Sequence, residues 1–187
     1  MGEYDKTGNH PLLNVVVAIV VVVAIIGGYV WATYTGPVHT GEVLSMSAYP
    51  IHRELSTGSG LGGLSGGPNV YDEVIVIVNV QVKSTTKLPL FLQDAFADVT
   101  LANGEVQESR SAGGEDAKKV FVAYPELAGQ KQPPLPLGIT MTPGQVVAGQ
   151  LIFHFPISKQ DWDGRRAFDL DVRFINQKSL VLHAMGS

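Results

Sequence analysis

Cysteine is absent from all 187 residues. This absence excludes disulfides, thiolate zinc sites, iron–sulfur clusters, thioether-linked haem and cysteine nucleophiles. Charged residues are also scarce, at 16% of the chain against a usual ~25%. The net charge of −4 differs in sign from the basic surface that nucleic-acid binding requires, so we expect no nucleic-acid partner.

Catalytic and metal-binding motifs are missing as well. The histidines show no HxH, HxxH or HExxH spacing, and no G-x-S-x-G nucleophile motif is present. The Gly/Ser-rich segment 56–68 leads into a predicted strand, whereas a phosphate cradle requires Gly-Lys-Ser/Thr followed by a helix. It is therefore interpreted as a flexible loop. We expect a protein that is not an enzyme and needs no cofactor.

One long apolar run lies near the N-terminus. Leu12–Trp31 reads LLNVVVAIVVVVAIIGGYVW, and Asn14 is its only strongly polar residue. About 20 helical residues span the ~30 Å hydrocarbon core of a bilayer. The run is longer than the roughly 7–15 residues of a signal-peptide core, and the segment before it is not basic. The sequence predicts an uncleaved anchor, with a tail at 1–11, a transmembrane helix at 12–34 and a separate domain at 35–187.

Charge and aromatic residues predict how this anchor is oriented. Lys6 is the nearest basic side chain on one side of the run, whereas Arg53 is the first on the other. Basic residues favour the cytoplasmic side, and tyrosine and tryptophan favour the headgroup layer, where Tyr29 and Trp31 would lie. We expect a single-pass protein of the cell membrane with a cytoplasmic N-terminus. The C-terminal domain would be extracytoplasmic, in the periplasm or at the cell surface.

The anchor also carries candidate contacts to another transmembrane helix. Helices in lipid associate through close packing and polar contacts, because lipid tails are as apolar as valine. Asn14 and Ala18 share one helix face, and Gly27 and Gly28 allow close approach of another backbone. These four residues are predicted to contact a partner helix. A second interpretation stays open, in which Asn14 reaches headgroups and the glycines ease the end of the helix.

The rest of the chain has the pattern of a β protein. Short stretches of alternating hydrophobicity are separated by Gly, Pro and Asn, which predicts an antiparallel sandwich of seven or eight strands. The expected strands are Gly41–Ile51, Tyr71–Lys83, Leu90–Leu101, Glu105–Ser109, Lys119–Ala123, Gln145–Phe155, Phe168–Phe174 and Leu180–Leu182. Asn103-Gly104 predicts a type I′ hairpin turn. A short helix is expected at Ser158–Gly164, with Ser158 as N-cap and Trp162 packed on the sandwich. The proline-rich segment Glu126–Leu137 is expected to run extended along the surface.

Several of these stretches resemble a known bacterial family. The quoted segments are Val74–Lys83, the turn Ser84-Thr85-Thr86-Lys87, Leu90-Phe91-Leu92, Phe96–Leu101 with Asn103-Gly104, and Thr142–Gln145 followed by Gly149–Pro156. Together they are similar to the immunoglobulin-like domain of unknown function numbered four-three-five-two, across roughly Val70–Phe174. The turn departs from the family pattern, which has Asn and Ser where this chain has Ser84 and Thr85. The resemblance implies an immunoglobulin-like sandwich outside the cytoplasm, often tethered by one helix, with no established chemistry.

The expected function is therefore that of a non-catalytic, membrane-tethered interaction domain, an accessory or structural subunit of a larger membrane complex. Its expected partners are the lipid bilayer and other membrane subunits. An alternative is a calcium- or glycan-binding surface, for which the candidate ligands are Asp161, Asp163, Asp169 and Asp171. Calcium requires six to eight oxygen ligands, and no EF-hand spacing is present. Neighbouring arginines favour the interpretation of these carboxylates as a solvated ion-pair edge.

Overall fold

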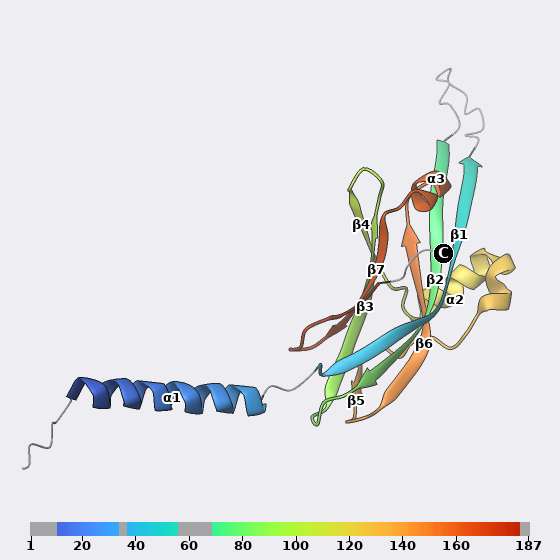
Figure 1. The fold of residues 1–187 in the computed structure, drawn as a ribbon. Coiled ribbons are helices and arrows are strands. Elements are labelled where there is room, and N and C mark those ends of the chain that lie inside the picture. Colours follow the sequence, from blue (N-terminus) through green and yellow to red (C-terminus); the bar gives the residue numbers. More distant parts are fainter. Residues whose placement is uncertain (1–10, 34–36, 56–68, 184–187) are drawn as a thin grey trace, which may run out of the picture. The chain divides into compact units, whose positions relative to one another are not determined.

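The chain folds into two compact units, Met1–Gly36 and Pro37–Ser187. In the computed structural model the described residues are 11–33, 37–55 and 69–183. The N-terminal unit contains one helix, α1 (Pro11–Thr33). The second unit is a sandwich of two antiparallel sheets (Figure 1). The predicted tail before Pro11 and the predicted Gly/Ser-rich loop 56–68 lie outside the described residues, apart from position 11 itself.

The two sheets differ in size. Sheet A has the order β1-β2-β6, and sheet B has the order β4-β3-β7-β8 with β5 paired to the start of β3. Sheet A contains β1 (His39–Leu55), β2 (Asn69–Ser84) and β6 (Val146–Phe155). Sheet B contains β3 (Leu90–Thr100), β4 (Val106–Arg110), β5 (Ile139–Met141), β7 (Ala167–Phe174) and β8 (Leu180–His183). The predicted antiparallel β-sandwich is confirmed, although β5 was not expected.

Alternating side chains from the two sheets form the main core. The even-numbered valines of β2 from Val74 to Val82 are fully buried. Together with the inward-facing residues of β6 in the same sheet, they pack against the alternating apolar residues of β3 and β7. The ring centroid of Phe168 lies 6.5 Å from that of Phe153 and 5.8 Å from that of Trp162, both in edge-to-face geometry. Trp162 belongs to α3 (Lys159–Asp163), whose N-cap Ser158 accepts a hydrogen bond from the Asp161 amide at 3.0 Å. The predicted short helix and its packing are confirmed.

The outer face of sheet A carries a second, smaller core. Ile75, Ile77 and Ile152 are buried there beneath α2 (Gly114–Ala123) and the 3₁₀ helix η1 (Pro125–Gln130). The strand predicted at Lys119–Ala123 is therefore wrong, since those residues belong to α2. A short apolar run does not distinguish a strand from a helix. Glu115 and Asp116 in the first turn favour the helix, because their charges complement its dipole.

The turn between β3 and β4 also differs from the expectation. Gly104 has a φ of +90°, but Asn103 is not among the described residues with positive φ. A type I′ turn requires positive φ at both central residues. The Gly104 amide instead donates to the Leu101 carbonyl at 3.0 Å, and the Leu101 amide donates to the Glu105 carbonyl at 2.8 Å. Gly104 thus adopts a left-handed backbone conformation at the end of the turn. This conformation lets the chain enter β4 without a type I′ turn.

The proline-rich segment crosses the edge of β6 and is held there by one residue. The Gln150 amide donates to the Pro133 carbonyl at 2.8 Å, and the Leu135 amide donates to the Gln150 carbonyl at 3.0 Å. A Cβ atom at Gly149 would lie 2.4 Å from the Leu135 backbone, so only glycine permits this close approach. The expected extended conformation holds for this part of the segment, whereas its beginning forms η1.

Candidate functional site

The four predicted aspartates lie on two separate elements. Asp161 and Asp163 belong to α3, where Asp161 accepts from the Ser158 hydroxyl at 2.7 Å and Asp163 forms an ion pair with Lys159. Asp169 and Asp171 lie on the outer face of β7. Among the described residues, no group of three or more histidine or carboxylate side chains is arranged to hold a metal ion.

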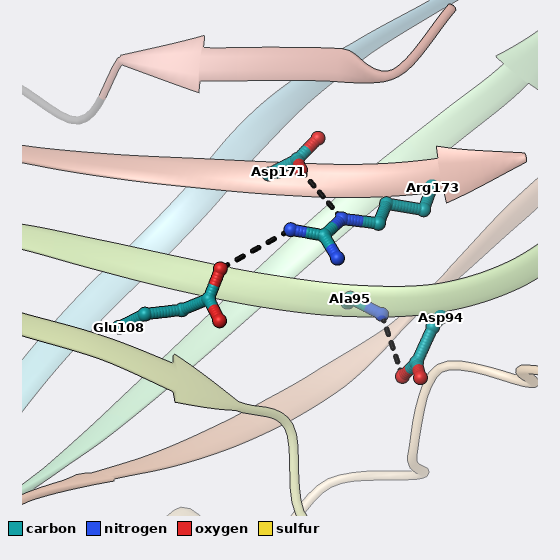
Figure 2. Close-up of polar contacts among 5 residues, drawn as sticks. All are labelled: Asp94, Ala95, Glu108, Asp171 and Arg173. Atoms are coloured by element: carbon teal, nitrogen blue, oxygen red, sulfur yellow. Dashed lines mark hydrogen bonds and ion pairs between the residues drawn. The ribbon is translucent and has the colours of Figure 1, made fainter.

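Both β7 carboxylates have basic partners. Asp169 pairs with His183 Nδ1 at 2.6 Å, and Asp171 accepts from Arg173 Nε at 2.8 Å. Arg173 Nη2 also lies 3.2 Å from Glu108, as Figure 2 shows. This part of sheet B thus forms the ion-pair edge that the sequence favours, with Arg173 as the arginine that contacts Asp171.

One row on this edge places like charges directly opposite each other. The register aligns Asp98 with Glu108 on β4 and with Asp169 on β7. Burial raises the pKa of Asp98, and repulsion from Glu108, Asp171 and Asp169 raises it further against the opposing effect of Arg173. Facing carboxylates destabilise a sheet, so this row costs stability at neutral pH.

A pocket opens on the other sheet, between α2 and the outer face of sheet A. Its volume is about 280 Å³. The apolar lining residues are Ile75, Ala112, Val120, Ile152 and Phe153, and the polar ones are Glu73, Arg110, Tyr124 and His154. We call this cavity the α2 pocket. Ligand pockets of roughly 300–1,000 Å³ hold drug-sized molecules, so the α2 pocket suits a small group such as one side chain.

Glu73 is the centre of a hydrogen-bonded group at the rim of the α2 pocket. The Tyr124 hydroxyl donates to one carboxylate oxygen of Glu73, and His154 Nε2 donates to the other at 2.7 Å. An ionised carboxylate only accepts, so Nε2 of His154 carries a proton. The Arg53 guanidinium stacks over the Tyr124 ring, 4.9 Å from its centroid. Residues from the strands β1, β2 and β6 and from the C-cap of α2 are therefore joined at this rim.

The charge state of this rim follows from its contacts. Burial would raise the pKa of Glu73, but the hydrogen bonds from Tyr124 and His154, with the charges of His154 and Arg53, lower it overall. The pKa of Tyr124 is raised by burial and by the neighbouring Glu73 anion. Glu73 is thus an anion and Tyr124 a neutral phenol at physiological pH.

A second charged pair involves Arg110, which also lines the α2 pocket. Asp94 sits at a register shift in β3 and is only 9% exposed. One of its oxygens accepts from the Ala95 amide at 2.9 Å, a contact drawn in Figure 2, and the other pairs with Arg110 Nη2 at 2.5 Å. The bulge therefore places a partly buried carboxylate where it anchors the Arg110 side chain beside the pocket.

The α2 pocket combines an apolar lining with polar rim groups that bond to one another. Both oxygens of Glu73 accept from neighbouring side chains, while Ile75, Val120 and Ile152 supply apolar surface. Apolar pockets bordered by polar groups are typical of sites that receive a partner's apolar side chain.

The predicted helix contacts are all in α1. With 3.6 residues per turn, Asn14, Ala18 and Gly28 lie on one face of the helix, and Gly27 points to the opposite side. Within the part of the chain that the structure describes, a Cβ placed at either glycine would have open space around it. Among the described residues, no helix combines the length and apolar character that crossing a membrane demands.

Comparisons with known proteins add likenesses of fold only. No family model matches the sequence, and no curated protein sequence matches it. Among solved structures, the chain is similar to the yjhA protein from Bacillus subtilis at 13% identity, with a TM-score of 0.45 over 80% of this chain and 94% of that one. A functionally unknown protein from Listeria monocytogenes EGD-e matches at 10% identity, with a TM-score of 0.43 over 80% and 79%. An uncharacterized beta-sandwich protein from Clostridium difficile 630 matches at 10% identity, with a TM-score of 0.37 over 81% and 88%.

Sequence reasoning did not find the α2 pocket. Its polar residues are far apart in the chain, since Glu73 and His154 are separated by 81 positions. The alternation of β6 does place His154 on the outer face, opposite the core residues Phe153 and Phe155, as the sequence predicts. The missing signal was α2 itself, because a strand at those residues leaves no cover for Ile75 and Ile77.

Proposed function

We propose that this chain is a membrane-tethered, non-catalytic interaction protein, an accessory or structural subunit of a larger membrane complex. The observation that carries the proposal is an apolar surface pocket, with its polar groups bonded to one another, on a domain that follows an apolar helical run. The helix provides the tether, and the sandwich provides the partner surface.

The support for the tether is in the sequence. The 20-residue run Leu12–Trp31 is apolar apart from Asn14, which is the pattern from which the sequence predicts a membrane span, and the run lies within the helix α1. In lipid such a segment is helical because its backbone has no other hydrogen-bond partners. The basic residues favour a cytoplasmic N-terminus, which places the sandwich outside the cytoplasm.

The family assignment is part of the same proposal. We propose that the sandwich is related to the immunoglobulin-like domain of unknown function numbered four-three-five-two, which its segments from Val70 to Phe174 resemble. Two of these segments form β2 and β6. The two strands pair from Val74, opposite Phe155, to Lys83, opposite Val146. Their pairing supports the idea that the resemblance extends through one continuous sheet.

Co-purification of the full chain from its native membrane tests the helix contact. Gly28→Leu adds a bulky side chain to the face that holds Asn14 and Ala18, and it should abolish recovery of the partner. Gly27→Leu makes the same change on the opposite side of α1 and should leave recovery intact. If both variants retain the partner, the contact lies in the sandwich, and if neither native nor variant protein recovers one, the accessory role is refuted.

The same experiment tests the α2 pocket. Ala112→Phe should fill the cavity and weaken recovery, whereas Val122→Phe changes a residue that is 80% exposed on α2 and should have no effect. Circular dichroism of both variants checks that the fold is kept. Equal recovery with both variants would remove the pocket from the proposal and leave the α1 face as the partner site.

The calcium- or glycan-binding alternative makes a different prediction. Calorimetric titration of calcium should then release heat that Asp169→Asn with Asp171→Asn abolishes. Under our proposal these carboxylates form ion pairs with His183 and Arg173 and bind no calcium. Native and variant protein should then show the same background heat.

A further inference from the structure

The chain enters the sandwich at one end, and two turns flank that entry point. The Thr85 amide donates to the Val38 carbonyl at 3.0 Å, and His39 Nε2 donates to the Lys178 carbonyl at 2.6 Å. His39 is 7% exposed and stacks on Phe174 at 4.4 Å. The β2–β3 turn (85–89) and the β7–β8 turn (175–179) are thus fixed beside residues 37–39. We call these three segments the entry end, at the foot of β1 in Figure 1.

The entry end is basic although the protein is acidic. Lys87 and Lys178 are exposed in the two turns, and Lys83 is exposed on β2 just before them. No aspartate or glutamate occurs in 37–41, 83–93, 138–147 or 174–182, whereas the whole chain has 17 acidic residues and a net charge of −4. The first acidic residue of the sandwich is Glu42, farther along β1. Positive charge is therefore concentrated where the chain enters the domain.

Apolar side chains are exposed beside these lysines. Leu88 is 72% exposed, and Ile175 is 44% exposed. Both lie in the turns, where neither contributes to the core between the sheets. Exposed aliphatic residues interspersed with lysines, without acidic residues, are typical of surfaces that lie at the headgroup layer of an anionic bilayer.

We propose that the entry end rests on anionic lipid headgroups, with Lys87 and Lys178 against the phosphates and Leu88 and Ile175 in the interface. The inference rests on the proposed membrane tether, because the chain between Thr33 and His39 reaches at most about 20 Å when extended. A helix that ends in the headgroup layer thus keeps this end of the sandwich near the bilayer. The surface would hold the domain, and its α2 pocket, at a defined orientation to a membrane partner.

Lipid quenching of single fluorophores tests this contact in the full chain. Because the protein has no cysteine, Gln177→Cys gives one label in the β7–β8 turn, and Ala102→Cys gives one in the β3–β4 turn as a control. The labelled proteins are reconstituted into phosphatidylcholine vesicles with or without phosphatidylglycerol, each containing headgroup-labelled quencher lipid. We expect strong quenching at position 177 in anionic vesicles and little at position 102.

Charge reversal then isolates the lysines. The double variant with Lys87→Glu and Lys178→Glu should lower the ratio of quenched to unquenched protein by about fivefold for each lysine. Raised salt should lower this ratio as well. Lys118→Glu with Lys119→Glu reverses two exposed lysines on α2 and should leave quenching unchanged. Equal quenching at positions 177 and 102, or no response to phosphatidylglycerol, would overturn the proposal.

Alkaline carbonate extraction of the same vesicles separates the two proposals. Protein that resists extraction but is not quenched at position 177 refutes the lipid contact and leaves the tether. Protein that is extracted, yet is quenched at position 177 before carbonate is added, refutes the tether and leaves the lipid contact. Extraction without quenching refutes both.

Discussion

The carboxylate of Glu73, at the rim of the α2 pocket, makes the free energy of unfolding of the sandwich depend on pH. Its hydrogen bonds determine the sign of that dependence. Glu73→Gln keeps the shape of the side chain but removes the charge that accepts from Tyr124 and His154. Hydrogen bonds to charged groups contribute about 1.5–3 kcal/mol each and neutral ones about 0.5–1.5 kcal/mol, so each bond loses about 1 kcal/mol. The His154 side chain is 55% exposed, which screens its share. We expect a loss of about 1–2 kcal/mol at neutral pH.

The sign of the pH dependence follows from the lowered pKa of Glu73. A carboxyl whose pKa is lower in the folded state stabilises the protein above its unfolded value of 4.5, and this contribution is lost as pH falls through the folded value. In urea unfolding of residues 37–187 at pH 7, the free energy of unfolding should therefore be about 1–2 kcal/mol higher for the native protein than for Glu73→Gln. The difference should shrink steadily below about pH 4.5.

Glu115→Gln is the matched control for this experiment. Its carboxylate pairs with Lys118 on the exposed side of α2, with 81% of the side chain exposed. The change should therefore cost only about 0.5 kcal/mol, through the helix dipole and this surface pair. A Glu73→Gln difference that is constant from pH 7 to pH 3, or equal to that of Glu115→Gln, would contradict the ionised network at the pocket rim.

Two other predictions concern the sheets. Asp98→Asn should stabilise the domain by about 0.2–1 kcal/mol at pH 7 by removing a facing like charge. Because the pKa of Asp98 is raised, this advantage should disappear as pH falls towards 3.8, whereas Asp116→Asn on α2 should give no gain at any pH. Gly149→Ala should destabilise the domain by about 1–3 kcal/mol, since its Cβ overlaps the Leu135 backbone. Gly129→Ala, with open space around it, is the control, and equal denaturation midpoints for the two alanine variants would contradict the close crossing.

The sandwich was predictable because its strands show a period of two along their buried faces. Phe168–Phe174 alternates without interruption, and the valines of Val74–Val82 all occupy one face, although Ile75 and Ile77 are buried on the other. The pattern therefore identifies both strands and, for Phe168–Phe174, the face that points inward. The same alternation puts His154 on the outer face. For these strands the local sequence and the three-dimensional packing carry the same information.

The candidate site was not predictable for a physical reason. The apolar residues of α2 are few and pack on Ile75 and Ile77, so their helical role depends on a surface that another segment provides. The Glu73 network joins residues from four elements through tertiary contacts, and no local pattern encodes such pairings. The prediction of a type I′ turn at Asn103-Gly104 was wrong because this dipeptide suits more than one turn type. The hydrogen bonds of Leu101 determine which type forms.

Alkaline carbonate extraction of native membranes tests the central claim most directly. The account predicts that the full chain stays in the membrane pellet. It also predicts that protease added from the extracytoplasmic side releases a fragment that begins after about Thr35 and contains the sandwich. Recovery of the untreated protein in the carbonate supernatant, or an N-terminus at or near Thr33 before protease is added, would contradict it.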